Sequence, residues 1–160
     1  MRKWPFFVLT AGVSAALDLA TKAWVQAAVE PFESIPVVPG FFHLTHVMNR
    51  GAAFSILSEA EGLRTPILVA VTLLALAFVL WMYVRLDPGR RIAEAGLALI
   101  FGGAVGNLAD RLRYGAVVDF LDVFWRGYHW PAFNVADAAI CVGAGLVIIA
   151  EFTGRKPHAA

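Results

Sequence analysis

The segment Gly102–Asp122, GGAVGNLADRLRYGAVVDFLD, places polar and charged side chains in a part of the chain that is otherwise apolar. A second segment, Phe133–Asp137 (FNVAD), again combines an asparagine and an aspartate with apolar residues. Ionisable groups inside membrane-spanning segments are energetically unfavourable, so by default they indicate a functional site. The two segments therefore predict that Asp119 and Asp137 form a catalytic carboxylate pair, and that the rest of the chain holds this pair in place.

The composition indicates a membrane protein. Of the 160 residues, 59% are hydrophobic and 16% are charged, whereas soluble domains carry roughly 25% charged residues. The formal net charge of +1 does not suggest a nucleic-acid partner. The chain is also too short for two domains of ordinary size, so we expect one integral membrane domain over residues 1–160.

Four apolar stretches are long enough to cross a bilayer, which takes about 20 helical residues. They cover residues 5–28, 67–84, 92–112 and 134–152, and two longer loops cover residues 29–65 and 113–133. The predicted fold class is an all-α membrane protein with a four-helix bundle. Gly102 and Gly106 follow the GxxxG spacing that lets membrane helices approach closely.

Basic residues mark one side of this bundle. They precede the first span, separate the second from the third, and follow the fourth: Arg2, Lys3, Arg85, Arg90, Arg91, Arg155 and Lys156. Because short cytoplasmic flanks are enriched in Lys and Arg, we expect both termini in the cytoplasm and the two longer loops outside.

Polar side chains from three spans are expected to lie at one depth. At about 1.5 Å of rise per residue, Asp18, Asn107 and Asp137 each lie roughly 20 Å above the basic end of their span. In a core about 30 Å thick, that level is just under the outer surface.

Asp18 and Lys22 are four residues apart and can pair on one helix face, and we expect this pair to serve folding more than chemistry. Alternatively, Lys22 extends to the interface and Asp18 only neutralises it.

The two outer loops carry further signals. Phe41–Met48 is predicted to be a strand, on which His43 and His46 would point to opposite faces. Shared metal ligation is therefore not expected, and we expect both histidines at the surface or at an interface. The apolar residues 117–125 should lie on the membrane surface or against the bundle. Asn134 is a plausible N-cap for the fourth helix, with Asp137 in its first turn.

Five motifs in this order resemble those of the lipoprotein signal peptidases, also called signal peptidase II. They are Asp18-x-x-Thr21-Lys22, Asn49-Arg50-Gly51-Ala52-Ala53-Phe54, Gly106-Asn107-x-x-Asp110-Arg111, Val117-Val118-Asp119-Phe120 and Phe133-Asn134-x-Ala136-Asp137. The resemblance implies four transmembrane helices with a small extracytoplasmic β-cradle and a short surface helix or loop. It also implies a bacterial aspartic endopeptidase that cuts prolipoproteins just before a diacylglyceryl-modified cysteine and is inhibited by cyclic peptides such as globomycin.

The same resemblance assigns roles to individual residues. It implies that Asp119 and Asp137 are catalytic, with a supporting or substrate-binding set of Asp18, Lys22, Asn49, Gly51, Asn107, Asp110, Arg111, Asn134 and Ala136. The implied partners are lipidated prolipoproteins and membrane lipid, without nucleic acid, metal or cofactor. We expect a monomer in the bacterial inner membrane, with its active site near the outer leaflet.

The chemistry of the residues agrees with a peptidase but leaves details open. Two carboxylates that share one proton can activate water and protonate a leaving amine. Asn107 and Asn134 could bond to the aspartates or to the scissile peptide, and Arg111 could pair with Asp110 or with a substrate carbonyl. The sequence contains no HExxH motif, so it does not indicate a zinc-dependent hydrolase. The alternatives are a structural membrane subunit and a small proton-coupled transporter subunit, since intramembrane acids also mark ion paths.

Overall fold

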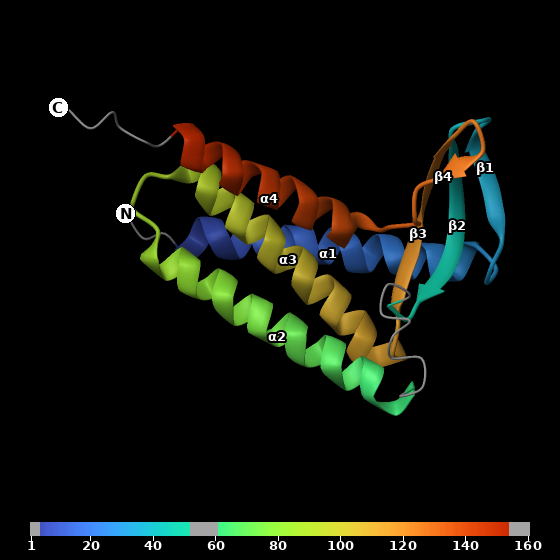
Figure 1. Ribbon diagram of the computed structural model, residues 1–160, viewed down its shortest axis with the longest axis horizontal. Helices are drawn as coiled ribbons and strands as arrows, with labels where there is room; N and C mark the ends of the chain where they lie inside the picture. The colour runs from blue at the N-terminus through green and yellow to red at the C-terminus, as the bar shows by residue number, and fades with distance from the viewer. Residues whose placement is uncertain (1–3, 52–60, 154–160) are drawn as a thin grey trace.

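Long helices and one small antiparallel sheet make up the fold in the computed structural model, which describes residues 4–51 and 61–153 (Figure 1). The helices are α1 (Trp4–Ala28), α2 (Glu61–Arg85), α3 (Arg91–Tyr114) and α4 (Val135–Thr153). The strands are β1 (Ser34–Val38), β2 (Phe42–Asn49), β3 (Val117–Trp125) and β4 (Tyr128–His129). All four helices are long and apolar enough to cross a membrane, so the predicted combination of four membrane-length helices and a small sheet is confirmed.

Some of the sequence predictions concern residues outside these ranges. They include Ala52, Ala53 and Phe54 of the loop motif and the terminal basic residues Arg2, Lys3, Arg155 and Lys156. The short surface helix implied by the resemblance does not occur within residues 4–51 and 61–153.

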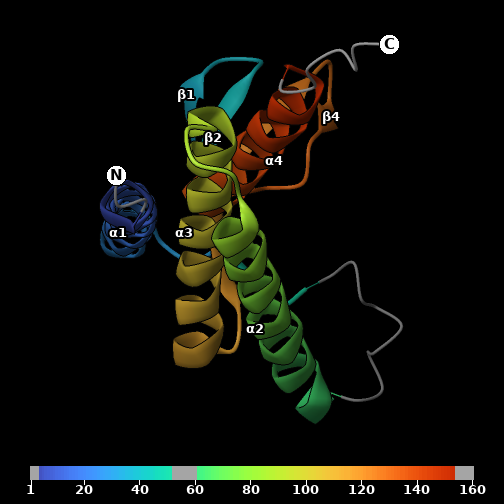
Figure 2. The same cartoon turned by 90° about the vertical axis from the view of Figure 1, so that its left-hand side faces the viewer.

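The central helix is α3, which packs against α1, α2 and α4. Figure 2 shows α1 on one side of α3 and both α2 and α4 on the other. Gly102 and Gly103 make this packing possible, because a Cβ at either would clash with a backbone carbonyl, that of Ala11 on α1 or Ala136 on α4. Gly106, the second glycine of the predicted GxxxG pair, lies against the Asp18 carboxylate, so the predicted close approach at Gly102 and Gly106 is confirmed.

An aromatic cluster fixes the end of the bundle that lies away from the sheet. Phe7 on α1 stacks on Tyr83 of α2, with ring centroids 4.1 Å apart. The Tyr83 hydroxyl donates to Glu94 on α3 over 3.2 Å, and Leu97 packs in the same buried cluster. Three helices are thus tied together here, which leaves the opposite end of the bundle for the polar residues.

The sheet has the strand order β1-β2-β3-β4 and lies across the other end of the bundle (Figure 1). Gly115 adopts a left-handed conformation (φ 70°) that ends α3 and turns the chain into β3. The first four residues of β3 are buried, and Phe120 packs against Val25 and Val29 at the end of α1. The expectation that residues 117–125 lie against the bundle therefore holds for the first half of the segment, which forms a strand.

The predicted strand is present as β2, but the prediction for one of its histidines is wrong. His46 is buried, and its Nδ1 lies 2.8 Å from the carbonyl oxygen of Val29. The strand register shifts between Leu44 and Val47, and such a bulge interrupts the regular alternation of side chains. His43 is only partly buried, and its Nδ1 lies 3.6 Å from Asp122.

We expect Gly103→Ala to lower the melting temperature in detergent, because the new Cβ would lie 2.5 Å from the Ala136 carbonyl oxygen. Relieving an overpacked contact of this kind costs about 1–3 kcal/mol. Gly145→Ala is the matched control, since a Cβ there meets nothing within 4 Å and alanine favours the helix by up to about 1 kcal/mol. Identical melting of Gly103→Ala and the wild type would contradict the close contact between α3 and α4.

Candidate active site

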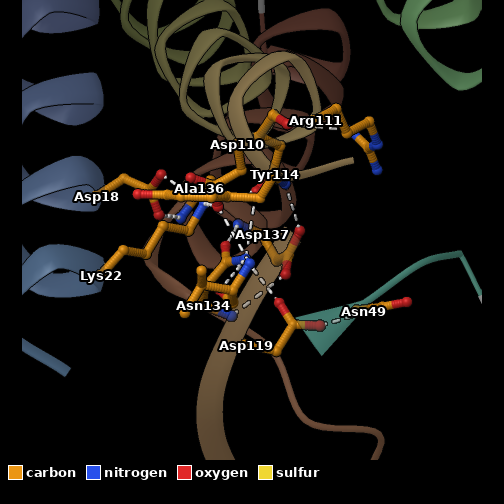
Figure 3. Close-up of polar contacts among 12 residues, drawn as sticks. Asp18, Lys22, Asn49, Asp110, Arg111, Tyr114, Asp119, Asn134, Ala136 and Asp137 are labelled. Carbon is orange, nitrogen blue, oxygen red and sulfur yellow. Dashed lines mark hydrogen bonds and ion pairs between the residues drawn. The ribbon is translucent and has the colours of Figure 1, made fainter. Parts of the chain in front are cut away.

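A buried ammonium group lies at the sheet end of the bundle. Lys22 Nζ lies 2.7 Å from Asp18 Oδ2 and 2.9 Å from Asp110 Oδ2, and it donates to Asn107 Oδ1 over 2.9 Å. All four side chains are buried. Figure 3 shows Asp18 and Lys22 reaching from α1 toward this network. The predicted Asp18–Lys22 pair is confirmed, and Asn107 links it to the carboxylate of Asp137.

The two carboxylates beside Lys22 also hold backbone amides of neighbouring segments. Asp18 Oδ1 accepts a hydrogen bond from the Ala136 N–H over 2.8 Å. Asp110 Oδ2 accepts one from the Val118 N–H over 3.1 Å. The network thus reaches α4 and β3 through their main chains, and the sequence did not indicate these two contacts.

Asp119 lies on β3 with only 2% of its surface exposed. Its Oδ2 accepts a hydrogen bond from Asn49 Nδ2 over 2.8 Å, and its Oδ1 accepts one from Asn134 Nδ2 over 2.7 Å. Asn49 is oriented in turn by Gly51, whose N–H donates to Asn49 Oδ1 over 2.8 Å. Gly51 has φ 83°, a conformation that favours glycine.

Asp137 lies in the first turn of α4, where its carboxylate accepts two hydrogen bonds. Its Oδ1 accepts from Asn107 Nδ2 over 2.8 Å, and its Oδ2 accepts from the Asn134 N–H over 3.2 Å. The Asn134 side-chain oxygen accepts the Asp137 N–H over 2.9 Å, so the two residues cap the helix reciprocally. The prediction that Asn134 is the N-cap is confirmed, and its side chain also bonds to Asp119.

The environment of Asp119 favours its protonated form. Burial is the main cause that raises the pKa of Asp119 to about 6, and the negative charge of Asp137 adds to this effect. The hydrogen bonds from Asn49 and Asn134 and the charge of Lys22 act in the opposite direction. A buried carboxyl with a raised pKa beside a second carboxylate is one arrangement that can supply the acid and the base for hydrolysis.

A cavity of about 370 Å³ lies beside Asp119. Its lining residues come from β2 and the residue after it, the start of α2, β3 and the segment before α4: Val47, Met48, Asn49, Arg50, Arg64, Asp119, Pro131 and Ala132. The lining combines four apolar side chains with two arginines, one asparagine and the carboxylate of Asp119. Sequence reasoning did not assign Arg50 or Arg64 to this region.

Two neighbouring residues, Arg111 and Asp122, make other contacts. Arg111 does not pair with Asp110, which contacts Lys22 instead; Arg111 Nη1 lies 3.4 Å from the Asn107 carbonyl oxygen. Asp122, three residues beyond Asp119, accepts a hydrogen bond from His129 Nδ1 over 2.8 Å on the exposed part of the sheet. Across residues 4–51 and 61–153, no group of three His, Cys, Asp or Glu side chains is arranged to hold a metal ion.

Comparisons with known proteins assign the family. Residues 10–153 match the model of the signal peptidase (SPase) II family. The chain belongs to the signal peptidase II family. The lipoprotein signal peptidase of Geobacter metallireducens is 51% identical over 143 residues, or 89% of this chain and 88% of the relative. That of Syntrophotalea carbinolica is 43% identical over 160 residues, or 100% of this chain and 99% of the relative.

A solved structure agrees with this assignment. A bacterial membrane enzyme determined by the in meso method at 1.9 Å resolution has a TM-score of 0.85 and 30% identity to this signal peptidase II, covering 95% of this chain and 96% of that one. The expectation of an aspartic peptidase is thereby confirmed, and nothing in the comparisons supports the transporter alternative.

The raised pKa of Asp119 predicts a pH-dependent stability. The folded state binds the Asp119 proton more tightly than the unfolded chain, so this contribution is present below pH 4 and is lost as the pH rises through about 6. Raising the pKa of Asp119 from its ordinary value of 3.8 to about 6 corresponds to a loss on the order of 3 kcal/mol. We therefore expect the melting temperature of Asp119→Asn, relative to the wild type, to increase between pH 4 and pH 7. A constant difference across this range would contradict the prediction, and Asp122→Asn is the control.

Proposed function

We propose that this signal peptidase II hydrolyses the peptide bond just before the diacylglyceryl-modified cysteine of prolipoproteins, with Asp119 and Asp137 as its catalytic residues. The observation that carries the proposal is the position of Asn134, which donates to Asp119 through its side chain and to Asp137 through its main chain. One residue thus holds both carboxyl groups, and Asp119 lines the neighbouring cavity. The names of the relatives, lipoprotein signal peptidase, support the choice of substrate.

In the proposed mechanism, Asp119 holds the shared proton and Asp137 is the base. Asp137 takes a proton from a water molecule, whose oxygen bonds to the scissile carbonyl carbon while Asp119 gives its proton to the carbonyl oxygen. When the carbon–nitrogen bond breaks, Asp137 gives its proton to the leaving amine and the hydroxyl proton returns to Asp119. The raised pKa of Asp119 supports this assignment, because it keeps Asp119 protonated to a higher pH than an ordinary aspartate.

The amide donors around the pair have a role in this mechanism. Asn49 and Asn134 donate to Asp119, and Asn107 donates to Asp137. These bonds hold the carboxyl planes in one orientation before the substrate arrives, so little reorganisation is needed during the reaction. Arg111 lies half-buried in the same region, and we assign it to the substrate carbonyl groups rather than to Asp110.

We further propose a bacterial inner-membrane enzyme that acts as a monomer with both termini in the cytoplasm. The basic residues Arg85, Arg90 and Arg91 at the end of the bundle away from the sheet support this orientation. The sheet and the aspartate pair then lie near the outer leaflet, where a cysteine carrying two acyl chains would be positioned. The substrate enters sideways from the lipid, and its membrane helix lies beside the bundle.

Substitution of either catalytic aspartate tests the proposal. We expect Asp119→Asn and Asp137→Asn each to reduce cleavage of a lipidated prolipoprotein by a factor on the order of 10⁴ or more, because asparagine can neither accept nor donate the proton. The double variant should be no worse than either single variant, since the pair acts as a unit. The measurement is a gel-shift assay with purified protein at matched folded concentration.

Asp122→Asn is the internal control for this assay, because Asp122 lies on the same strand but bonds to His129. It should retain most of the activity. If Asp137→Asn still cleaved the substrate at a sizeable fraction of the wild-type rate while Asp122→Asn did not, the catalytic pair would have to be reassigned to Asp119 and Asp122.

A further inference from the structure

Lys22 contacts three side chains, and each of these bonds to one of the catalytic aspartates or to the residue just before it. Its ammonium group has three N–H donors, and its three partners are carboxylate or amide oxygens of Asp18, Asp110 and Asn107. Asn107 then donates to the Asp137 carboxylate over 2.8 Å. Because the Asn107 oxygen faces Lys22, its NH₂ group is the part that remains available for Asp137.

The two carboxylates have matching positions relative to the catalytic residues. Asp18 holds the N–H of Ala136, the residue immediately before Asp137. Asp110 holds the N–H of Val118, the residue immediately before Asp119. The Ala136 N–H lies in the first turn of α4, where a helix has no partner of its own for its amides. Each catalytic aspartate is therefore anchored through the preceding backbone amide.

We propose that Lys22 is a positioning residue that sets the separation of the two catalytic carboxyl groups, by holding Asp18 and Asp110 against a single ammonium. This inference rests on the proposed function of Asp119 and Asp137. Lys22 touches neither catalytic carboxylate in the contacts described above, so it acts through Ala136, Val118 and Asn107. Its role in the reaction goes beyond neutralising Asp18.

Electrostatics explains why the ammonium is needed. Without it, the buried carboxylates of Asp18 and Asp110 would repel each other, since both now lie within 3 Å of one Nζ atom. Their separation would move the Ala136 and Val118 amides, and with them the aspartates. A misplacement of about 1 Å can lower a catalytic rate on the order of 100-fold.

Lys22 also acts on Asp119 through its charge. Its positive charge lowers the pKa of Asp119, whereas the negative charge of Asp137 on α4 raises it. Arg111 on α3 also interacts with Asp119. Removing the charge of Lys22 should therefore move the limb of the activity profile that Asp119 governs to higher pH.

The test compares Lys22→Met, Asp110→Ala and Asp110→Asn with Glu94→Ala. Glu94 is the matched control, because it is also a buried acid on α3 with a basic partner, Arg91, but lies at the opposite end of the helix. The readouts are kcat and KM per folded molecule, the pH profile, and hydrogen exchange of the segments that contain Val118 and Ala136.

We expect Asp110→Ala to lose activity on the order of 100-fold in kcat, with KM little changed and faster exchange at Val118. Asp110→Asn keeps an oxygen that can accept the Val118 N–H and should recover most of this loss. Lys22→Met should lower kcat and move the pH profile upward, while Glu94→Ala should lose activity only in proportion to the folded fraction.

Two results would overturn the positioning role. One is a folded Lys22→Met protein with the kcat and pH profile of the wild type. The other is an Asp110→Ala protein whose activity falls only in proportion to its folded fraction. If Lys22→Met does not fold, the two Asp110 variants decide the question. If the wild type does not cleave the lipidated prolipoprotein, the proposed function fails instead. In that case, hydrogen exchange at Val118 and Ala136 that is the same in the variants as in the wild type would still contradict the proposed anchoring of these two amides.

Discussion

The contact on which the rest of the structure depends is the buried ammonium of Lys22 between Asp18 and Asp110. Burying these groups is tolerable only because all of them are paired and hydrogen-bonded; removing one partner from a buried ion pair costs about 3–5 kcal/mol. The ion pairs join α1 to α3, and the carboxylates then bond to the main chains of α4 and β3. Four separate segments are thus held around one charge.

Helix packing and this polar network require each other. Gly106 on α3 lies directly against the Asp18 carboxylate, where a Cβ would clash. Because Gly102 and Gly106 of α3 have no side chain, α1 can approach closely enough for Lys22 to reach Asn107 and Asp110. In a bilayer, where apolar helix faces gain little by leaving lipid, such close contacts and interhelical hydrogen bonds stabilise the association. The same contacts hold the aspartates in position.

The sequence predicted those features that depend on hydrophobic length, helical spacing and side-chain type. Four spans, the strand β2, the pairing of Asp18 with Lys22 and the helix cap at Asn134 all follow from such patterns. The amide contacts of Ala136 and Val118 could not be predicted, because every residue except proline has an N–H and its partner depends on tertiary structure. The buried position of His46 was missed because the bulge in β2 leaves no distinctive residue pattern.

The central claim is that Asp119 and Asp137 act together on one peptide bond beside the cavity. A crystal structure of the Asp137→Asn protein with a lipidated prolipoprotein peptide would test it most directly. We expect the scissile carbonyl group to lie between the side chains of residues 119 and 137, within hydrogen-bonding distance of both, about 2.6–3.2 Å. A bound peptide whose scissile bond lies away from either side chain, or next to Asp122 and His129, would contradict the account.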